Sequence, residues 1–185
     1  MASTRELREL AKWLRNHIEP VSSFETKDTY RAAAHLTDGT FLPCVVFSNP
    51  AERLKLALRR FEETRKDRSL DPSINYEAIV KAFAIDGSRV SAWQIARIDH
   101  SRFAIPAKLR DVVFAAGETR MSWIQFVGTM ADGSSHSFGS PFNIEFFDMP
   151  EGYSAKDMVE VVSHTQTDGR RYNDLPFFDC FLDDL

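Results

Sequence analysis

The chain has 185 residues, of which 43% are hydrophobic and 27% are charged, and its formal net charge is −4. These fractions are those of a globular protein, so they exclude a disordered, collagen-like or coiled-coil chain. No apolar run approaches the roughly 20 residues that a membrane-spanning helix needs. The length predicts one domain over residues 1–185.

The start of the chain and its cysteines indicate a cytoplasmic protein. The first residues are polar and charged, and no apolar segment of the kind found in secretory signals follows them. Cys44 and Cys180 are too few for a disulfide framework. Both lie among large apolar neighbours, where a free thiol behaves as a small buried hydrophobe.

An N-terminal helix is predicted over residues 3–19. Ser3 and Glu6 have the spacing of a capping box, in which each side chain accepts a hydrogen bond from the backbone of the other residue. Pro20 ends the helix. The apolar residues that follow the cap recur at helical spacing: Leu7, Leu10, Leu14 and Ile18.

Asp-Gly pairs recur along the chain and predict hairpin turns, because a tight turn needs the positive φ that glycine tolerates. The pairs are Asp38-Gly39, Asp86-Gly87, Asp132-Gly133 and Asp168-Gly169. Their spacing is unequal and their flanks are dissimilar, so we interpret them as similar turns that arose separately. The strands expected around them are Tyr30–Leu36, Thr40–Phe47, Ile79–Ile85, Val90–Ile98, Met121–Met130, Ser135–Phe138, Phe142–Phe147, Met158–Thr167 and Arg170–Tyr172.

A second helix is predicted from Pro50 to about Arg68, with Asn49 as its cap. Its expected apolar stripe consists of Leu54, Ala57, Leu58 and Phe61. Its basic residues offer a nucleic-acid-binding surface as a weaker functional alternative, and they include Arg53, Arg59, Arg60 and Lys66. Acidic residues alternate with them and the chain is acidic overall, which disfavours nucleic acid as a partner.

The later segments give mixed signals. A short helix is predicted from Pro106 to Gly117, with Leu109, Val112 and Val113 buried. Residues 154–163 combine a helix cap with valines that favour a strand, so helix and strand both remain open there.

The C-terminal part, residues 121–185, is acidic and rich in phenylalanine. It carries 3 Lys and Arg against 11 Asp and Glu, whereas residues 1–120 carry 20 against 16. Apolar residues of the segment 174–185 lie at helical spacing, and we expect this segment to dock on its own domain. Its residues are also the candidate partner-binding group, namely Phe177, Phe178, Phe181, Asp183 and Asp184.

Together these elements predict an α+β fold: a largely antiparallel sheet built from the Asp-Gly hairpins and packed against two or three helices.

Motifs with a known catalytic mechanism are absent from the sequence. It contains no phosphate-binding loop, dinucleotide fingerprint, HExxH or CxxC. The segment Gly133–Ser137 lacks the last glycine of a nucleophile elbow. A small hydrolase with a scattered site is the alternative, and its candidate residues are His100, His136, Glu145 and Asp148, together with His35. No cofactor and no bound metal are expected.

The functional hypothesis that follows is a non-catalytic interaction or regulatory protein, which acts through a protein-binding surface. The missing catalytic motifs, the uneven charge and the phenylalanine-rich C-terminal part favour it. A protein partner is expected and a membrane is not, while a homo-oligomer stays open. A pocket that brings two or more of the candidate histidines and carboxylates together would favour the hydrolase instead.

Overall fold

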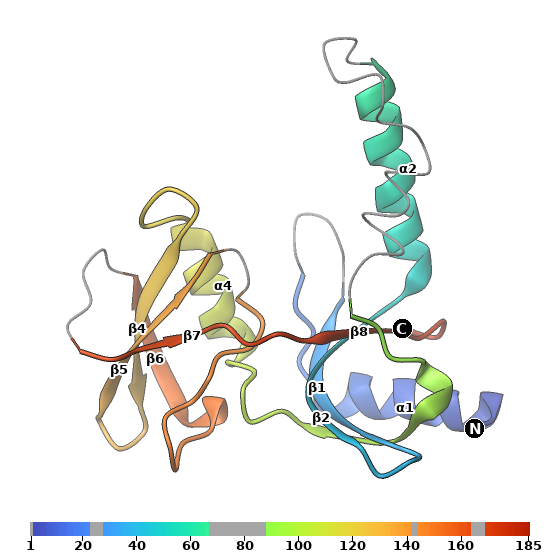
Figure 1. Cartoon of the computed structure of the whole chain (residues 1–185), viewed down its shortest axis with the longest axis horizontal. Helices are drawn as coiled ribbons and strands as arrows, with labels where there is room; N and C mark the ends of the chain where they lie inside the picture. Colours follow the sequence, from blue (N-terminus) through green and yellow to red (C-terminus); the bar gives the residue numbers. More distant parts are fainter. Residues whose placement is uncertain (1, 23–27, 67–87, 142–143, 164–168) are drawn as a thin grey trace.

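The computed structural model describes residues 2–22, 28–66, 88–141, 144–163 and 169–185. Two four-stranded sheets lie side by side, each with its own helix, and form two lobes (Figure 1). Lobe 1 contains α1 (Thr4–His17), β1 (Tyr30–Leu36), β2 (Phe41–Ser48), α2 (Pro50–Lys66), the 3-10 helix η2 (Ala92–Gln94), β3 (Ile95–His100) and β8 (Phe178–Phe181). Lobe 2 contains α4 (Ala107–Ala116), β4 (Ile124–Met130), β5 (Ser135–Ser140), the 3-10 helix η3 (Ala155–Asp157), β6 (Met158–Ser163) and β7 (Arg171–Asn173).

The predicted α+β class is confirmed, whereas the single sheet is wrong, because the strands form two sheets. Both sheets are mixed, with strand orders β3-β1-β2-β8 and β6-β4-β5-β7. In each sheet a central antiparallel hairpin has one antiparallel neighbour and one parallel neighbour. The two lobes therefore share one topology.

The turns of the two central hairpins match in detail. Asp38-Gly39 connects β1 to β2, and Asp132-Gly133 connects β4 to β5. The Gly39 N–H donates to the Leu36 carbonyl at 3.0 Å, and the Gly133 N–H donates to the Met130 carbonyl at 2.9 Å. The two glycines have φ values of 91° and 85°, which a residue with a side chain rarely adopts.

Each turn also binds the 3-10 helix that precedes the next strand. The Thr37 N–H donates to Gln94 O at 2.8 Å in lobe 1, and the Ala131 N–H donates to Asp157 O at 2.7 Å in lobe 2. The lobes thus repeat one structural unit of helix, hairpin, 3-10 helix and edge strand. The sequence did not show this repeat because only the turn and the Ser-Ala that opens each 3-10 helix are alike.

The other Asp-Gly pairs behave differently. Asp86-Gly87 and the expected strand Ile79–Ile85 lie outside the described residues, as does Asp168. The strands on either side of Asp168-Gly169 are β6 and β7, which lie at opposite edges of their sheet and are not paired with each other.

Two other segments differ from the expected strands, and the sequence leaves a third open between helix and strand. Residues 92–94 form η2 before β3 begins, and residues 144–147 form no strand, although Phe147 makes an isolated bridge to Asp174. Residues 155–163 are a 3-10 helix followed by a strand, so each of the two conflicting signals there describes part of the segment.

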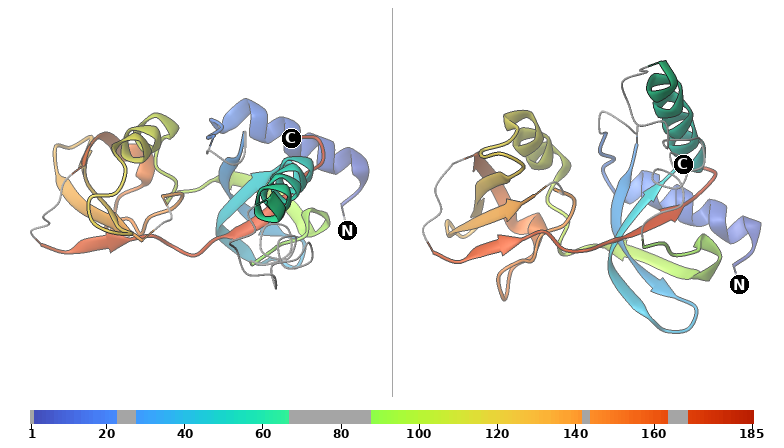
Figure 2. Two further views of the ribbon diagram at one scale, coloured as in Figure 1. Left: turned by 90° about the horizontal axis from the view of Figure 1, so that it is seen from above. Right: turned by 45° about the horizontal axis from the view of Figure 1, so that its top comes forward.

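The C-terminal segment 171–185 crosses both lobes (Figure 2). Its first strand, β7, runs parallel to β5, and its second, β8, runs parallel to β2. The helical spacing seen in the sequence was misleading, because strand pairing with β2 determines the conformation. The expected docking does occur, with Cys180 and Leu182 buried in the core of lobe 1.

Each lobe has a separate core. Ala11 and Leu14 of α1 are buried against the lobe 1 sheet, after the predicted capping box, in which the Glu6 N–H donates to Ser3 Oγ at 3.3 Å. Three phenylalanines lie at the centre of the lobe 2 core, with 5.2 to 5.8 Å between their ring centroids: Phe126, Phe138 and Phe147. One domain over residues 1–185 stays a prediction.

The buried faces of α2 and α4 were only partly predicted. In α2, Leu56 and Ala57 are buried, whereas Leu54 and Leu58 are exposed. In α4, Val113 is buried and Val112 is exposed, and Gly117 ends the helix with a φ of 71°.

Both cysteines are free and buried, as expected, and burial raises the pKa of each thiol to about 12.

Candidate functional site

The outer edges of the two sheets are not equally covered. At the β8 edge, the Val90 N–H donates to Asp179 O at 3.0 Å and the Asp179 N–H donates to Ser88 O at 2.8 Å. At the β7 edge, the Asp148 N–H donates to Asn173 O at 2.9 Å. In the described part of the chain, β3 pairs with β1 alone and β6 with β4 alone. These two strands therefore present backbone groups that a further strand could bind.

A cavity of about 670 Å³ lies between α1 and β3, and we call it the β3 groove. Five consecutive residues of β3, Ile95 to Asp99, line it. Because successive side chains of a strand point to opposite faces, five in a row line one cavity where it adjoins the edge of the strand. The groove therefore gives access to the edge of the sheet.

Helix α1 forms the opposite side of the groove. Leu10 and Trp13 contribute apolar surface, and the buried Ile95 and Ile98 of β3 contribute more. The Trp13 ring stacks on His17 with 4.7 Å between ring centroids. The polar residues of α1 that line the groove are Glu6, Glu9, Lys12, Asn16 and His17.

The charged residues of β3 are held by contacts with each other and with β1. Asp99 Oδ2 forms an ion pair with Arg97 Nη2 at 2.7 Å and lies 2.9 Å from His35 Nε2, which also lies 2.9 Å from Arg97 Nη2. His35 also packs against Phe41, with 4.8 Å between ring centroids. Because Arg97 and Asp99 compensate each other, the carboxylates of Glu6 and Glu9 dominate the charge at the α1 N-terminal end of the groove.

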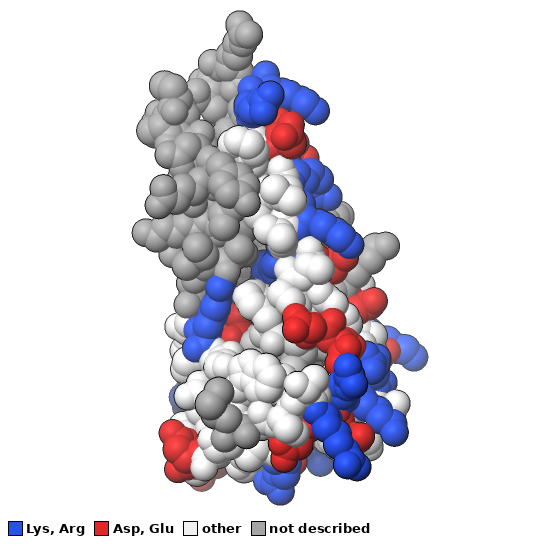
Figure 3. Space-filling model, turned by 90° about the vertical axis from the view of Figure 1, so that its right-hand side faces the viewer, with Lys and Arg blue, Asp and Glu red and all other residues white. Residues whose placement is uncertain are grey.

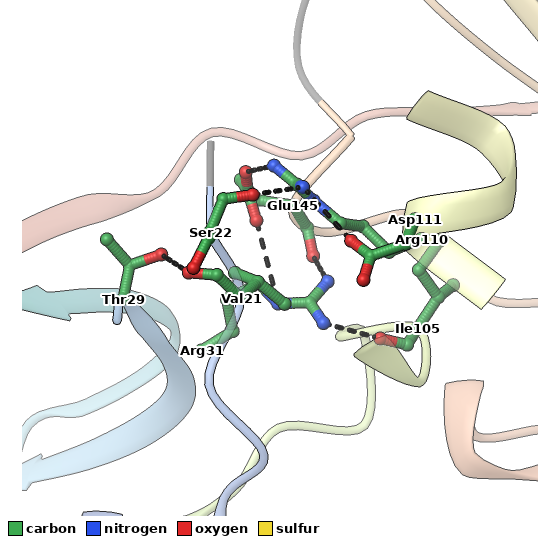
Figure 4. A network of polar contacts seen from close by, with 8 residues as sticks. All are labelled: Val21, Ser22, Thr29, Arg31, Ile105, Arg110, Asp111 and Glu145. Carbon is green, nitrogen blue, oxygen red and sulfur yellow. Dashed lines mark hydrogen bonds and ion pairs between the residues drawn. The ribbon is translucent and has the colours of Figure 1, made fainter. Parts of the chain in front are cut away.

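A buried network of charges joins the two lobes (Figure 4). Glu145 Oε1 accepts a hydrogen bond from Arg110 Nη2 at 2.9 Å, and Glu145 Oε2 lies 3.5 Å from Arg31 Nε. Arg31 Nη2 also donates to the Ile105 carbonyl at 2.8 Å. Burial lowers the pKa of Arg31 to about 10, although Glu145 opposes this effect. The network connects β1 of lobe 1 to α4 of lobe 2, which is a structural role.

The candidate residues for hydrolysis lie in different parts of the molecule. His100 ends β3 and packs edge-on against Trp13 at 5.7 Å, whereas His136 lies in lobe 2 between the rings of Tyr153 and Tyr172. Glu145 lies in the network between the lobes, and Asp148 is exposed beside β7. The structure therefore does not assemble the scattered site.

Ser134 and His136 do approach each other where the Asp132-Gly133 turn leads into β5. Ser134 Oγ lies 3.3 Å from His136 Nε2, but it donates to Asp132 at 2.7 Å. Tyr153 donates to the other oxygen of Asp132 at 2.6 Å. A nucleophilic serine needs a histidine base that a carboxylate orients. Here the carboxylate binds the serine and the tyrosine, so the cluster stabilises the turn.

The basic residues of α2 are paired with acidic ones. Arg53 lies 3.8 Å from Asp179, and Arg59 and Arg60 both pair with Glu63. Lys66 is exposed at the end of the helix. Figure 3 shows blue and red side chains interspersed along this helix. Among the described residues of that face, the alternating charges leave no continuous basic surface for phosphates.

The candidate partner-binding residues of the C-terminus make contacts within the chain. Phe177 packs against Phe146 between the two lobes, and the Phe181 ring lies 4.8 Å from the Arg89 guanidinium. Phe178 lies in β8 and is 36% exposed. Asp183 and Asp184 are both exposed, and Asp184 lies 3.5 Å from Arg8.

Among the described residues, no three His, Cys, Asp or Glu side chains are grouped so that they could hold a metal ion. The described helices include none that is long and apolar enough to cross a membrane. Comparisons with protein-family models, curated proteins and solved structures find no match to this chain.

Sequence reasoning missed the β3 groove. It gave the N-terminal helix only a cap and an apolar stripe, and it predicted Val90–Ile98 as a strand without a binding role. Trp13 was the available signal, because a tryptophan beside the apolar stripe of an amphipathic helix often marks a binding surface.

Proposed function

We propose that this protein is a non-catalytic, cytoplasmic interaction protein that binds an extended segment of a partner protein in the β3 groove. The observation that carries the proposal is the lining of the groove by Ala96 to Asp99, which gives access to the edge of β3. An edge strand can accept an extended peptide as an additional strand, and the main-chain hydrogen bonds then provide affinity.

The dimensions of the groove fit one added strand. Its volume of about 670 Å³ lies within the roughly 300–1,000 Å³ of typical ligand sites. Helix α1 lies on the side opposite β3, so an added strand would lie between the edge of the sheet and the helix. Side chains of the bound segment would reach α1, which makes α1 the source of specificity.

The lining residues indicate the sequence that the partner presents. Leu10 and Trp13 offer apolar surface, so an apolar residue of the segment packs there. Glu6 and Glu9 lie at the N-terminal end of α1, and they favour a lysine or arginine in the segment at that end. The expected ligand is a short extended peptide that combines these two residue types.

Peptides selected from a phage-displayed library of random dodecapeptides would test this proposal. Their affinities are measured by calorimetry for the native protein and for two matched variants, Ala96→Trp and Val159→Trp. Val159 of β6 occupies the position in lobe 2 that Ala96 of β3 occupies in lobe 1, and both are exposed. Tryptophan is common in strands, so both variants should fold.

We expect Ala96→Trp to fill the groove and weaken peptide binding at least about tenfold, while Val159→Trp leaves it unchanged. The selected peptides should also share the apolar and basic residues. Equal effects of the two variants, or no effect of Ala96→Trp, would refute the proposal. It would also fail if Ala96→Trp turned a native dimer into a monomer in sedimentation, because the occupant would then be a second copy.

A further inference from the structure

We propose that a second cavity, which lies between the two lobes, binds an oxyanion group of a ligand, either a phosphate or a carboxylate. We call it the interlobe cavity, and its volume is about 440 Å³. The end of α1, the end of β3, the linker to α4 and the start of η3 surround it. The lining residues are His17, Ile18, Glu19, Arg31, His100, Ser101, Arg102, Ala104, Ile105, Pro106, Ala107, Ser154 and Lys156.

Basic side chains predominate in this lining. Five lining residues are Arg, Lys or His, whereas Glu19 is the one carboxylate in the lining. Arg102 and Lys156 are exposed, and they approach the cavity from the linker and from lobe 2. Because Arg31 pairs with Glu145 and the histidines count as neutral, the local excess of positive charge comes from Arg102 and Lys156 against Glu19, and it favours an anionic ligand.

Arg31 gives the cavity a fixed cationic side chain. Its side chain is only 3% exposed, and the Ile105 and Glu145 carbonyls accept hydrogen bonds from its terminal nitrogens at 2.8 and 3.3 Å. Its Nε makes no hydrogen bond and faces Glu145 Oε2 at 3.5 Å. The guanidinium is therefore held in place before any ligand binds, which lowers the entropy lost on binding.

Helix α4 begins at the same cavity. Its cap residue is Pro106, which makes no side-chain hydrogen bond to the first turn, and Ala107 is its first helical residue. The backbone N–H groups at the start of a helix carry partial positive charge and bind anions. Together with the basic side chains, they provide donors for the several oxygens of a phosphate or carboxylate group.

The proposal is independent of the β3 groove, because His17 is the one residue that the two linings share. Neither Arg102 nor Lys156 lines the groove. Loss of anion binding in variants of these two residues would leave peptide binding intact, so the failure of either proposal can be distinguished from the failure of the other.

Titrations of the native protein with inorganic phosphate and with sodium acetate, followed by nuclear magnetic resonance at constant pH and ionic strength, test the proposal. We expect saturable shifts at His17, His100 and the amide of Ala107. The double variant Arg102→Gln/Lys156→Gln should weaken binding of the preferred anion at least about tenfold. Lys55→Gln removes an exposed lysine of α2 and should have no effect.

Tighter binding of phosphate would identify a phosphoryl group as the ligand, and tighter binding of acetate a carboxylate. The proposal would be overturned if neither anion gave saturable shifts at these residues, or if the double variant bound the preferred anion as tightly as Lys55→Gln does. Spectra of both variants without anion show whether the fold is retained.

Discussion

The two lobes have the same plan but differ in the space between their helix and their edge strand. In lobe 1, α1 and β3 leave the groove of about 670 Å³. In lobe 2, Val113 of α4 shares one apolar core with Met158 and Val161 of β6, and in lobe 1 Leu14 of α1 likewise shares a core with Ile98 of β3. Both lobes therefore bury their helix against the edge strand, and in lobe 1 a groove lies beside this core.

The residues of the central strands explain part of this difference. Three consecutive alanines in β1 give lobe 1 a sheet with small side chains, whereas stacked phenylalanines fill lobe 2. At Gly128 of β4, an added Cβ would meet Met158 Cε at 2.7 Å, so the methionine of β6 packs directly on the strand. Side-chain volume, and not topology, decides where space remains.

Deletion of Phe177–Leu185 should cause the largest loss of stability, and this loss should be confined to lobe 1. It removes β8, and with it the buried Cys180 and Leu182 from lobe 1, while β7 of lobe 2 is retained. Burial of each large apolar side chain contributes about 1.5–3 kcal/mol, so we expect a loss of more than about 4 kcal/mol in lobe 1. Hydrogen exchange should show unprotected β1 and β2 but protected β4 and β5. An equal loss of protection in both lobes would contradict the conclusion that each lobe has a separate core.

Glu145→Ala should have the second-largest effect, because it removes the carboxylate that two buried guanidinium groups share and leaves Arg110 with Asp111 at 3.4 Å. Arg31 and Arg110 are each 3% exposed at the side chain. Breaking a buried ion pair costs about 3–5 kcal/mol, whereas an exposed pair contributes about 0–1 kcal/mol. Glu63→Ala in the exposed pairs of α2 is the control. Denaturant unfolding that gave similar losses for both variants would rule out a structural role of the network.

Gly39→Ala and Gly133→Ala test whether the two turns are equivalent. Both glycines have positive φ, and neither has an atom within 4 Å of an added Cβ, so backbone strain is the main cost. We expect each substitution to cost about 1–2 kcal/mol. Thermal unfolding that gave clearly different losses would show that the turns are alike in geometry but not in energy.

The smallest expected effect is on the pKa of Asp132. The equivalent residue Asp38 has fewer kinds of hydrogen-bond partner and should not respond in the same way. A hydrogen bond from Tyr153, followed by hydrogen bonds from Ser134, lowers the pKa of Asp132 to about 2. The pKa of Asp38 is also lowered, by hydrogen bonds from Thr40 and without a tyrosine. A carboxyl with a lowered pKa stabilises the fold above its unfolded value near 3.8 and loses this effect as the pH falls toward 2.

Tyr153→Phe should therefore raise the pKa of Asp132 and reduce the acid sensitivity of lobe 2 between about pH 4 and 2, while the pKa of Asp38 stays unchanged. Carbon-detected titration of the aspartate carboxyls measures both values in one experiment. An unchanged pKa of Asp132 in Tyr153→Phe would mean that the tyrosine hydroxyl does not lower it.

The sequence predicted local structure well where backbone chemistry determines it. The capping box at Ser3 and Glu6 and the helix end at Gly117 formed as expected. It failed where tertiary pairing decides: residues 178–181 became a strand because β2 lies beside them, despite their helical spacing.

The candidate site could not be predicted from the sequence for a similar reason. The groove depends on how far α1 stands from β3, and that distance follows from packing between segments about 80 residues apart in the chain. His136 and Glu145 are close in sequence, yet His136 lies in β5 of lobe 2 and Glu145 lies between the lobes. Proximity in sequence could not distinguish these outcomes.

Hydrogen exchange of the backbone amides of β3 and β6, with and without a selected peptide, tests the central claim most directly. The account predicts that alternate amides among Ala96 to Asp99 gain protection in the complex, because every second N–H of an edge strand faces the added strand. The equivalent amides of Val159 to Val162 should not change. Protection that appeared in β6, or in neither strand, would contradict the assignment of the β3 groove as the binding site.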